Sequence, residues 1–289
     1  MRGVARRRRS RLLPLGGLAL VLLVVASACG GVSSEDATRS PRLQHIHGLG
    51  LNPADRSLYL ATHAGLFRIV PDSQEVERVG EGRLDTMGFA VVGPDRFVGS
   101  GHPDPRDGLP EMLGLIGSWD GGRSWSSLSL PGAADFHAIR ARGRRLVGYD
   151  AGSGRLMVSD DAGRTGHFSR TPAGLTDVVI DPAGSDRLVA ASPTGLLRTS
   201  DAGRTWSHLP GTGVALAWPA PSSLYAFTDD GGVSMSADAG ASWSSRAGLP
   251  GEPAAVTAAA ENVLIVALHD GTFANSSDGG RSWKRGPWS

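Results

Sequence analysis

Hydrophobic positions follow two different patterns along the chain. Near the N-terminus, one continuous apolar run extends from Leu12 to Ala26. From about residue 43 onward, apolar residues come in short stretches of strand length between turns rich in glycine and proline, as in Ser57–His63 followed by Gly65–Val70. This change of pattern predicts a leader followed by one all-β domain over residues 43–289.

The predicted strands belong to a repeat. A string of the form Ser/Thr-x-Asp-x-Gly-x-Ser/Thr-Trp occupies residues 118–125, 199–206, 236–243 and 276–283, and a degenerate copy at 159–166 ends in Gly166. The aspartates of the five copies lie 37 to 41 residues apart, at Asp120, Asp161, Asp201, Asp238 and Asp278. A period of about forty residues is typical of one four-stranded blade of a β-propeller.

The chemistry of the string favours a structural role for these five aspartates. A short carboxylate and a hydroxyl can accept backbone N–H groups in a tight hairpin, glycine adopts positive φ without steric cost, and tryptophan supplies a large apolar anchor. Calcium binding is the alternative, but each loop brings a single carboxylate, which is too few for that ion.

Counting the repeats predicts six blades. A first blade lacks the string, but its segment Gly65–Val70 parallels Gly195–Ser200 in a later repeat. The blades are then expected to begin near residues 43, 83, 133, 174, 213 and 252. The predicted fold is an all-β propeller of six four-stranded blades, with seven blades as the alternative.

Candidate chemistry gathers at one predicted face. Strands in a blade alternate in direction, so the starts of the innermost strands and the ends of the second strands share the face on which the channel opens. His45 and His47 are two positions apart on a strand and therefore point to the same side, as a chelating pair would. The expected ligands for a transition metal, zinc or copper, are His45, His47, His63, His102 and His137. A hydrogen-bonded polar collar is the alternative.

Further side chains near the same face are expected to bind an organic ligand or to orient the histidines. They are Asp85, Asp104, Arg106, Asp135, Tyr149, Asp150 and Asp177. The one large insertion, residues 101–114, contains three prolines and follows the second strand of the second predicted blade. Long loops in compact domains are usually functional or disordered, so we interpret this stiff loop as a lid or recognition loop.

The repeated strings resemble the Asp-box, or BNR, repeat. In addition, His45–Leu49, Ala61–Phe67, Ser100–Pro103 and Asp135–Ala138 are similar to exported bacterial BNR-repeat lipoproteins of the glycosylhydrolase-like group. The wider group includes sialidases, sortilin-type propellers and photosystem-II assembly factors. The resemblance implies a propeller whose Asp-boxes join the third and fourth strands of each blade, away from the ligand face.

Three functions remain open from the sequence. The first is a binding module with a metal site at the rim. The second is a glycoside hydrolase of the sialidase type, with Asp135, Tyr149 and Asp150 as catalytic candidates. Phe67–Pro71 resembles the sialidase arginine motif, but Arg68 is the repeat equivalent of Arg198, so an enzyme is less favoured. The third is a scaffold that binds a protein or peptide, as the sortilin-type and assembly-factor propellers do.

The N-terminal residues predict export. Basic residues Arg6–Arg11 precede the apolar run, and Ala26–Cys29 resembles a bacterial lipobox. We expect a signal peptide over residues 1–28, a lipidated Cys29 on the outer face of the membrane, and a flexible tether over residues 29–42. The alternative is an ordinary cleaved signal with an incidental cysteine.

The charge of the chain after residue 28 limits the classes of molecule that the protein is expected to bind. Residues 1–28 contain six of the 29 basic side chains and none of the 28 acidic ones, so the rest carries 23 basic and 28 acidic side chains, a net charge of −5. A folded part with this balance is not expected to bind nucleic acid, which requires a positive face. Small molecules, glycans and proteins remain the expected ligands, and we expect a monomer.

Overall fold

The computed structural model describes residues 45–71, 75–172 and 174–286, and this part of the chain consists of β-strands, turns and irregular segments. Its 24 strands form six sheets of four. The predicted signal peptide, Cys29 and the predicted tether all lie within residues 1–44, outside the described residues. Within those ranges, no helix is long and apolar enough to span a bilayer.

The strands follow one another along the chain in groups of four. Blades one and two comprise β1 (Ile46–Leu51), β2 (Leu58–Thr62), β3 (Gly65–Ile69), β4 (Val76–Arg78), β5 (Asp85–Gly93), β6 (Arg96–His102), β7 (Leu115–Ser118) and β8 (Ser126–Ser129). Blades three and four comprise β9 (Phe136–Arg142), β10 (Arg145–Asp150), β11 (Arg155–Ser159), β12 (His167–Arg170), β13 (Asp177–Ile180), β14 (Leu188–Ser192), β15 (Gly195–Thr199) and β16 (Ser207–His208). Blades five and six comprise β17 (Ala215–Ala220), β18 (Ser223–Phe227), β19 (Val233–Ser236), β20 (Ser244–Ser245), β21 (Pro253–Ala260), β22 (Val263–Leu268), β23 (Phe273–Ser276) and β24 (Lys284–Arg285).

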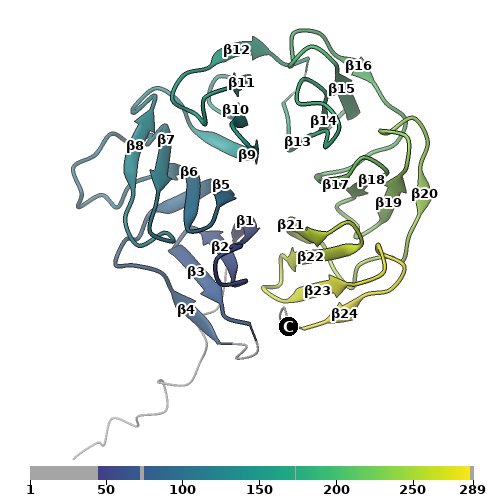
Figure 1. Cartoon of the computed structure of the whole chain (residues 1–289), viewed down its shortest axis with the longest axis horizontal. Helices are drawn as coiled ribbons and strands as arrows, with labels where there is room; N and C mark the ends of the chain where they lie inside the picture. The colour runs from purple at the N-terminus through teal and green to yellow at the C-terminus, as the bar shows by residue number, and fades with distance from the viewer. Residues whose placement is uncertain (1–44, 72–74, 173, 287–289) are drawn as a thin grey trace, which may run out of the picture. The chain divides into compact units, whose positions relative to one another are not determined.

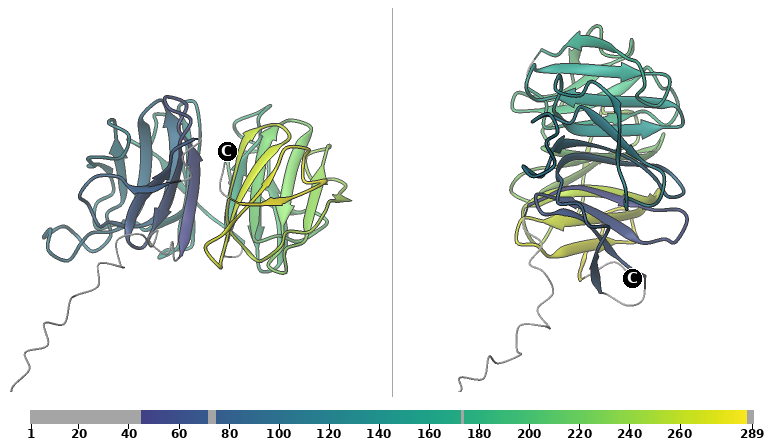
Figure 2. Two further views of the ribbon diagram at one scale, coloured as in Figure 1. Left: turned by 90° about the horizontal axis from the view of Figure 1, so that it is seen from below. Right: turned by 90° about the vertical axis from the view of Figure 1, so that its left-hand side faces the viewer.

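The six sheets stand around a central channel as the blades of a propeller (Figure 1). Each blade pairs its four consecutive strands antiparallel, with the first strand innermost, and the strands run between the two faces of the ring (Figure 2). The predicted six-bladed, all-β propeller is therefore confirmed. Each first strand begins within three residues of its predicted blade start.

The hydrophobic core is divided among the junctions between blades. The described residues form six buried clusters, and each combines side chains from two neighbouring blades. A second strand such as β2 is buried at every position, because one of its faces packs on the preceding blade and the other on the following blade. The short, continuously apolar stretches in the sequence are the consequence of this double burial.

The ring closes by side-chain packing between blade one and blade six. Ile46, Leu60 and Phe67 of blade one lie in one cluster with Ile265 and Phe273 of blade six. Each described sheet consists only of consecutive strands, so none of them is shared between the first and last blades. The seven-blade alternative is excluded.

In each of the five repeated aspartates, both carboxylate oxygens accept hydrogen bonds from the same loop. The Asp120 Oδ1 atom accepts the Ser124 backbone N–H at 3.0 Å, and its Oδ2 atom accepts the Ser124 hydroxyl at 2.6 Å. The Ser118 hydroxyl donates to Asp120 and accepts the Gly122 N–H at 2.8 Å. These bonds, those from Ser124 first, lower the pKa of Asp120 to about 2. The same contacts recur around Asp161, Asp201, Asp238 and Asp278.

Aromatic side chains after these loops seal the junctions between blades. The four tryptophans of the full strings each pack against one inter-blade cluster: Trp125, Trp206, Trp243 and Trp283. The degenerate copy has Gly166 at that place. Phe168, two residues further along, packs against the cluster between blades two and three and stacks on Phe136 with ring centroids 6.4 Å apart. The missing tryptophan is thus replaced by a nearby aromatic residue.

Close contact between blades two and three makes Gly88 sensitive to substitution. A Cβ atom at Gly88 would lie 2.2 Å from the Phe136 carbonyl oxygen. We expect Gly88→Ala to lower the free energy of unfolding by about 1–3 kcal/mol, as other overpacked sites do, measured by urea denaturation. Gly82→Ala is the control, because nothing lies within 4 Å of its Cβ position, and it should change stability by less than about 1 kcal/mol. Equal stability of both variants and the wild type would contradict the tight junction.

Candidate functional site

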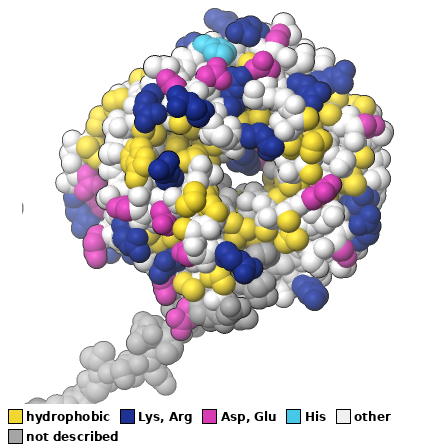
Figure 3. Space-filling model, in the orientation of Figure 1, with side chains coloured by type: hydrophobic (Ala, Val, Ile, Leu, Met, Phe, Trp, Pro, Cys, Tyr) yellow, Lys and Arg dark blue, Asp and Glu magenta, His cyan; other side chains and the backbone are white. Residues whose placement is uncertain are grey.

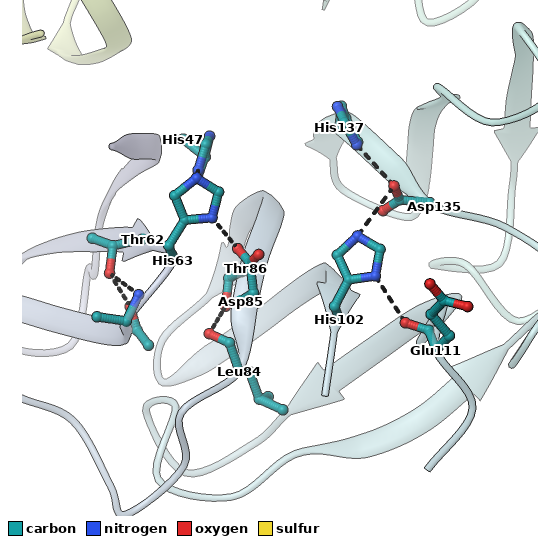
Figure 4. Close-up of polar contacts among 12 residues, drawn as sticks. His47, Thr62, His63, Leu84, Asp85, Thr86, His102, Glu111, Asp135 and His137 are labelled. Atoms are coloured by element: carbon teal, nitrogen blue, oxygen red, sulfur yellow. Dashed lines mark hydrogen bonds and ion pairs between the residues drawn. The ribbon is translucent and has the colours of Figure 1, made fainter. Parts of the chain in front are cut away.

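Histidine and aspartate side chains from three blades lie at one mouth of the channel. His63 directly follows β2 of blade one, and Asp85 begins β5 of blade two. His102 ends β6, and Asp135 directly precedes β9 of blade three. Because each of these positions is the start of an innermost strand or the end of a second strand, their side chains approach one another at the same face (Figure 4).

The first group, which we call the His47 cluster, consists of His47, His63 and Asp85. The Nε2 atoms of His47 and His63 are 3.1 Å apart. On the other side of its ring, the Nδ1 atom of His63 lies 2.7 Å from Asp85 Oδ1. One potential ligand atom from each of the three residues lies within 4.8 Å of the other two. The cluster therefore has the residue types and the spacing of a metal site.

The hydrogen bond to Asp85 determines which nitrogen of His63 carries the proton. An ionised carboxylate only accepts hydrogen bonds, so the Nδ1 atom of His63 donates to Asp85. In the neutral ring, the Nε2 atom of His63 then presents its lone pair toward His47. A histidine whose far nitrogen donates to a carboxylate is the usual arrangement of a metal-bound imidazole, because the carboxylate fixes the tautomer and raises the basicity of the ligand nitrogen.

His47 is held in its neutral form. Burial, followed by the neighbouring His63, lowers the pKa of His47 to about 4, although Asp85 acts in the opposite direction. A ring with this pKa is uncharged at neutral pH, and its Nε2 atom donates its proton to His63 Nε2 in the metal-free protein, so a metal ion bound there replaces that proton. Neutral imidazole is the form that ligates metal ions.

His45 lies beside this cluster. Its ring centroid is 5.2 Å from that of His63, and its backbone has a φ of 56°. A non-glycine residue in the left-handed region is uncommon, and here it precedes the first residue of β1. His45 is therefore a neighbour of the His47 cluster and stands outside the group of three.

The second group, which we call the Asp135 bridge, consists of His102, Asp135 and His137. The Oδ2 atom of Asp135 lies 2.8 Å from His137 Nε2 and 3.6 Å from His102 Nε2. The other ring nitrogen of His102 donates to the Glu111 carbonyl at 2.8 Å. The Oδ1 atom of Asp135 is buried and has no hydrogen-bond partner among the described residues. One carboxylate oxygen thus stands between two imidazoles.

In the Asp135 bridge, the pairing of opposite charges shifts the pKa of a histidine in the opposite direction to the shift of His47. The hydrogen bond to Asp135 raises the pKa of His137, against the effect of its burial. Burial acts to raise the pKa of Asp135, but His137 and then His102 outweigh it, and the net pKa of Asp135 is lowered. The bridge stabilises a positive ring on His137, whereas the first cluster keeps His47 neutral.

The two groups are neighbours. Asp85 and His102 are directly paired across β5 and β6, yet Asp85 contacts His63 in blade one while His102 contacts Asp135 at blade three. The positive charge of His137 contributes to the lowered pKa of His47. Blade two therefore connects the His47 cluster, through Asp85, to the Asp135 bridge, through His102.

Three other predicted residues serve the architecture of the ring. Asp150 is 3% exposed, and its carboxylate accepts the Asp135 N–H at 3.0 Å and the Ser153 hydroxyl. Tyr149 is buried in the core between blades three and four. Asp177 accepts the Leu216 N–H of blade five at 2.8 Å and pairs with Arg140 of blade three, and its burial raises its pKa despite Arg140.

The insertion is fixed to the protein at its C-terminal end. The Leu113 N–H donates to the Gly101 carbonyl, and the Gly132 N–H donates to the Met112 carbonyl, at 2.9 and 2.8 Å. Asp104 and Arg106 pair with each other inside the insertion. Beneath the loop lies a cavity of about 300 Å³, lined mainly by Leu84, Leu109, Pro110, Leu113 and Trp125. The insertion reaches the rim through its Glu111 carbonyl.

Two contacts made by residues of the candidate site could not be predicted from the sequence. The Glu111 carbonyl that orients His102 belongs to the main chain, which any residue would supply. The pairing of Arg140 with Asp177 joins residues 37 positions apart, and only the placement of two neighbouring blades brings them together.

Arg68 of the sialidase-like string pairs with Glu77 across β3 and β4 at 2.8 Å.

Comparisons with known proteins give the fold. Neither the protein-family models nor the curated protein sequences match this chain. Among solved structures, YCF48 from Cyanidioschyzon merolae is 16% identical and covers 86% of each chain with a TM-score of 0.53. A structure of YCF48 bound to D1 peptide has a TM-score of 0.55 at 16% identity, covering 85% of this chain and 83% of that one.

Glycoside hydrolases are also similar in fold. The GH74 xyloglucanase from Xanthomonas campestris is 19% identical with a TM-score of 0.56, over 86% of this chain and 46% of the enzyme. This chain therefore spans less than half of that enzyme's length. At these identities the likeness establishes the β-propeller fold alone, and it carries no information on ligand or reaction.

The opposite pKa shifts predict separate titrations. Side-chain NMR of the histidines should show His47 titrating with a midpoint below pH 5 and His137 above 6.5. The folded protein then binds fewer protons at His47 than the unfolded chain, whose histidines titrate near 6.5. The contribution of His47 to stability must therefore fall as the pH decreases from about 6.5 to 4. A His47 midpoint at or above 6.5 would contradict the buried, neutral ring.

Proposed function

We propose that this protein is an exported binding module that holds a transition-metal ion at the channel mouth. The ligands are the Nε2 atoms of His47 and His63, and Asp85 orients His63. The observation that carries the proposal is the approach of these two nitrogens to 3.1 Å with a carboxylate on the far side of one ring.

The spacing of the two nitrogens suits a shared ion. Zinc–nitrogen bonds of about 2.0–2.1 Å place two ligands of a tetrahedral ion about 3.3 Å apart. In the square arrangement preferred by copper(II), adjacent ligands lie about 2.9 Å apart. The separation of 3.1 Å between His47 and His63 falls between these values, so the distance suits either metal once the ion replaces the proton between the two nitrogens.

The site is open. Two imidazoles leave further coordination positions, and the exposed His63 and the neighbouring His45 place these positions at the surface of the mouth. An ion with such positions exchanges ligands with solvent. This supports reversible binding and transfer of the ion more than a closed, purely structural site, which is normally four-coordinate with protein ligands alone.

Location is a separate part of the proposal. The basic leader, the apolar run and the single cysteine at position 29 support export and attachment to the outer face of the membrane through a lipid on Cys29. A propeller held there would present its histidines to the extracytoplasmic medium, where free metal ions are taken up or sequestered.

Removal of either imidazole should abolish metal uptake. We expect His47→Ala and His63→Ala to lose binding of Zn²⁺ and Cu²⁺, and Asp85→Asn to weaken it by about 10- to 100-fold, the usual effect of removing a carboxylate that orients a ligand. Binding is measured by titration calorimetry and by elemental analysis of the purified protein.

The matched controls are His167→Ala and His208→Ala, because both histidines are exposed on outermost strands. They should bind metal as the wild type does. The proposal fails if the wild type binds neither ion, or if loss of His47 has no more effect than loss of His167.

The lipid anchor is tested in a bacterial host. Cys29→Ser should move the protein from the membrane fraction to the soluble extracytoplasmic fraction and abolish incorporation of labelled fatty acid, because no thiol remains to be acylated. Ser27→Ala, which keeps the cysteine and a small residue beside it, serves as the control. Membrane association of Cys29→Ser equal to that of the wild type would refute lipid attachment at Cys29.

A further inference from the structure

The channel contains a cavity of about 300 Å³ that none of the preceding functions uses. All six innermost strands contribute to its wall, through Leu49–Leu51 of β1, Phe89–Val91 of β5 and equivalent segments of β9, β13, β17 and β21. These residues lie toward the strand ends that are remote from His47 and Asp85, which belong to the strand starts. The cavity therefore opens toward the mouth opposite the histidines.

The wall combines apolar side chains with positive charge. Leu51, Val91, Pro219 and Ala258, which are partly exposed, supply apolar surface, and the ionisable side chains of the described residues that line the cavity are those of Arg140 and Arg142, both from β9. On the face drawn in Figure 3, hydrophobic side chains surround an open channel mouth together with Lys, Arg, Asp and Glu side chains. The charged side chains of the cavity wall are basic, which favours an anionic ligand over a metal ion.

The two arginines differ in their partners. Arg140 is already neutralised, because its guanidinium contacts the buried carboxylate of Asp177 at 2.7 Å. The exposed side chain of Arg142 forms no ion pair or hydrogen bond with any residue between 45 and 286 that the structure describes. One positive charge at the cavity is thus available for a ligand, and a guanidinium binds a carboxylate through two parallel hydrogen bonds.

The size of the cavity suits a small ligand. The volume of the cavity lies at the lower end of the range of about 300–1,000 Å³ usual for small-molecule pockets.

We infer that the channel cavity binds an amphipathic monoanion, a small carboxylate with an apolar body, whose head group is held by Arg142. The body of the ligand contacts Leu51, Val91, Pro219 and Ala258, and its single negative charge matches the single unpaired arginine. This site is distinct from the His47 cluster and does not depend on metal binding.

Octanoate is a suitable probe, with the uncharged octanol as its counterpart. Titration calorimetry should show octanoate binding to the wild-type protein, and octanol binding at least tenfold more weakly because it lacks the charge-assisted hydrogen bonds. Arg142→Ala should weaken octanoate binding by about 10- to 100-fold, since bonds to charged groups are the stronger ones. Arg142→Lys should retain part of the affinity.

Arg144→Ala is the matched control, because Arg144 lies on the same hairpin and outside the cavity wall. It should bind octanoate as the wild type does. The inference is wrong if octanoate does not bind, if octanol binds equally well, or if Arg142→Ala and Arg144→Ala behave alike.

Discussion

The structure depends on the burial of both faces of every blade. A blade of four short strands cannot bury either face alone, so each must be covered by a neighbour, and the six inter-blade clusters meet this requirement around the ring. Close approach then restricts residue size at the junctions. Gly122 illustrates this, since a Cβ atom there would lie 2.3 Å from Leu66 of the preceding blade.

The same constraint assembles the candidate sites. Packing the blades side by side brings all innermost strands around one channel with a common direction, so their starts meet at one mouth and their ends at the other. His47 and His137, 90 positions apart in the sequence, become close enough to influence each other's charge. The two ends of the channel therefore favour ligands of opposite charge. Imidazoles and carboxylates occupy one mouth, whereas Arg140 and Arg142 line the channel toward the other.

Much of the fold could be predicted from the sequence because its determinants are local. Each loop string contains nearly all of its own hydrogen-bond partners, as the contacts of Asp120 with Ser118 and Ser124 show, and so the repeat could be counted by inspection. The alignment of repeats also placed His63 and Asp85 at one rim. Their division from His102 and His137 into two groups could not be predicted, because it depends on which side chain turns toward which neighbouring blade. For the same reason, the role of Phe168 in place of a tryptophan and the burial of Asp150 emerged only from the three-dimensional packing.

Ring closure without a shared strand has a consequence for how the molecule holds together. Blades one and six behave as two binding partners joined by a tether of four blades, and their association is intramolecular, driven by the effective concentration that the intervening blades impose. Every change in the curvature of those four blades alters that concentration, even when it lies far from the contact itself. The affinity of the first blade for the last is therefore a property of the whole ring.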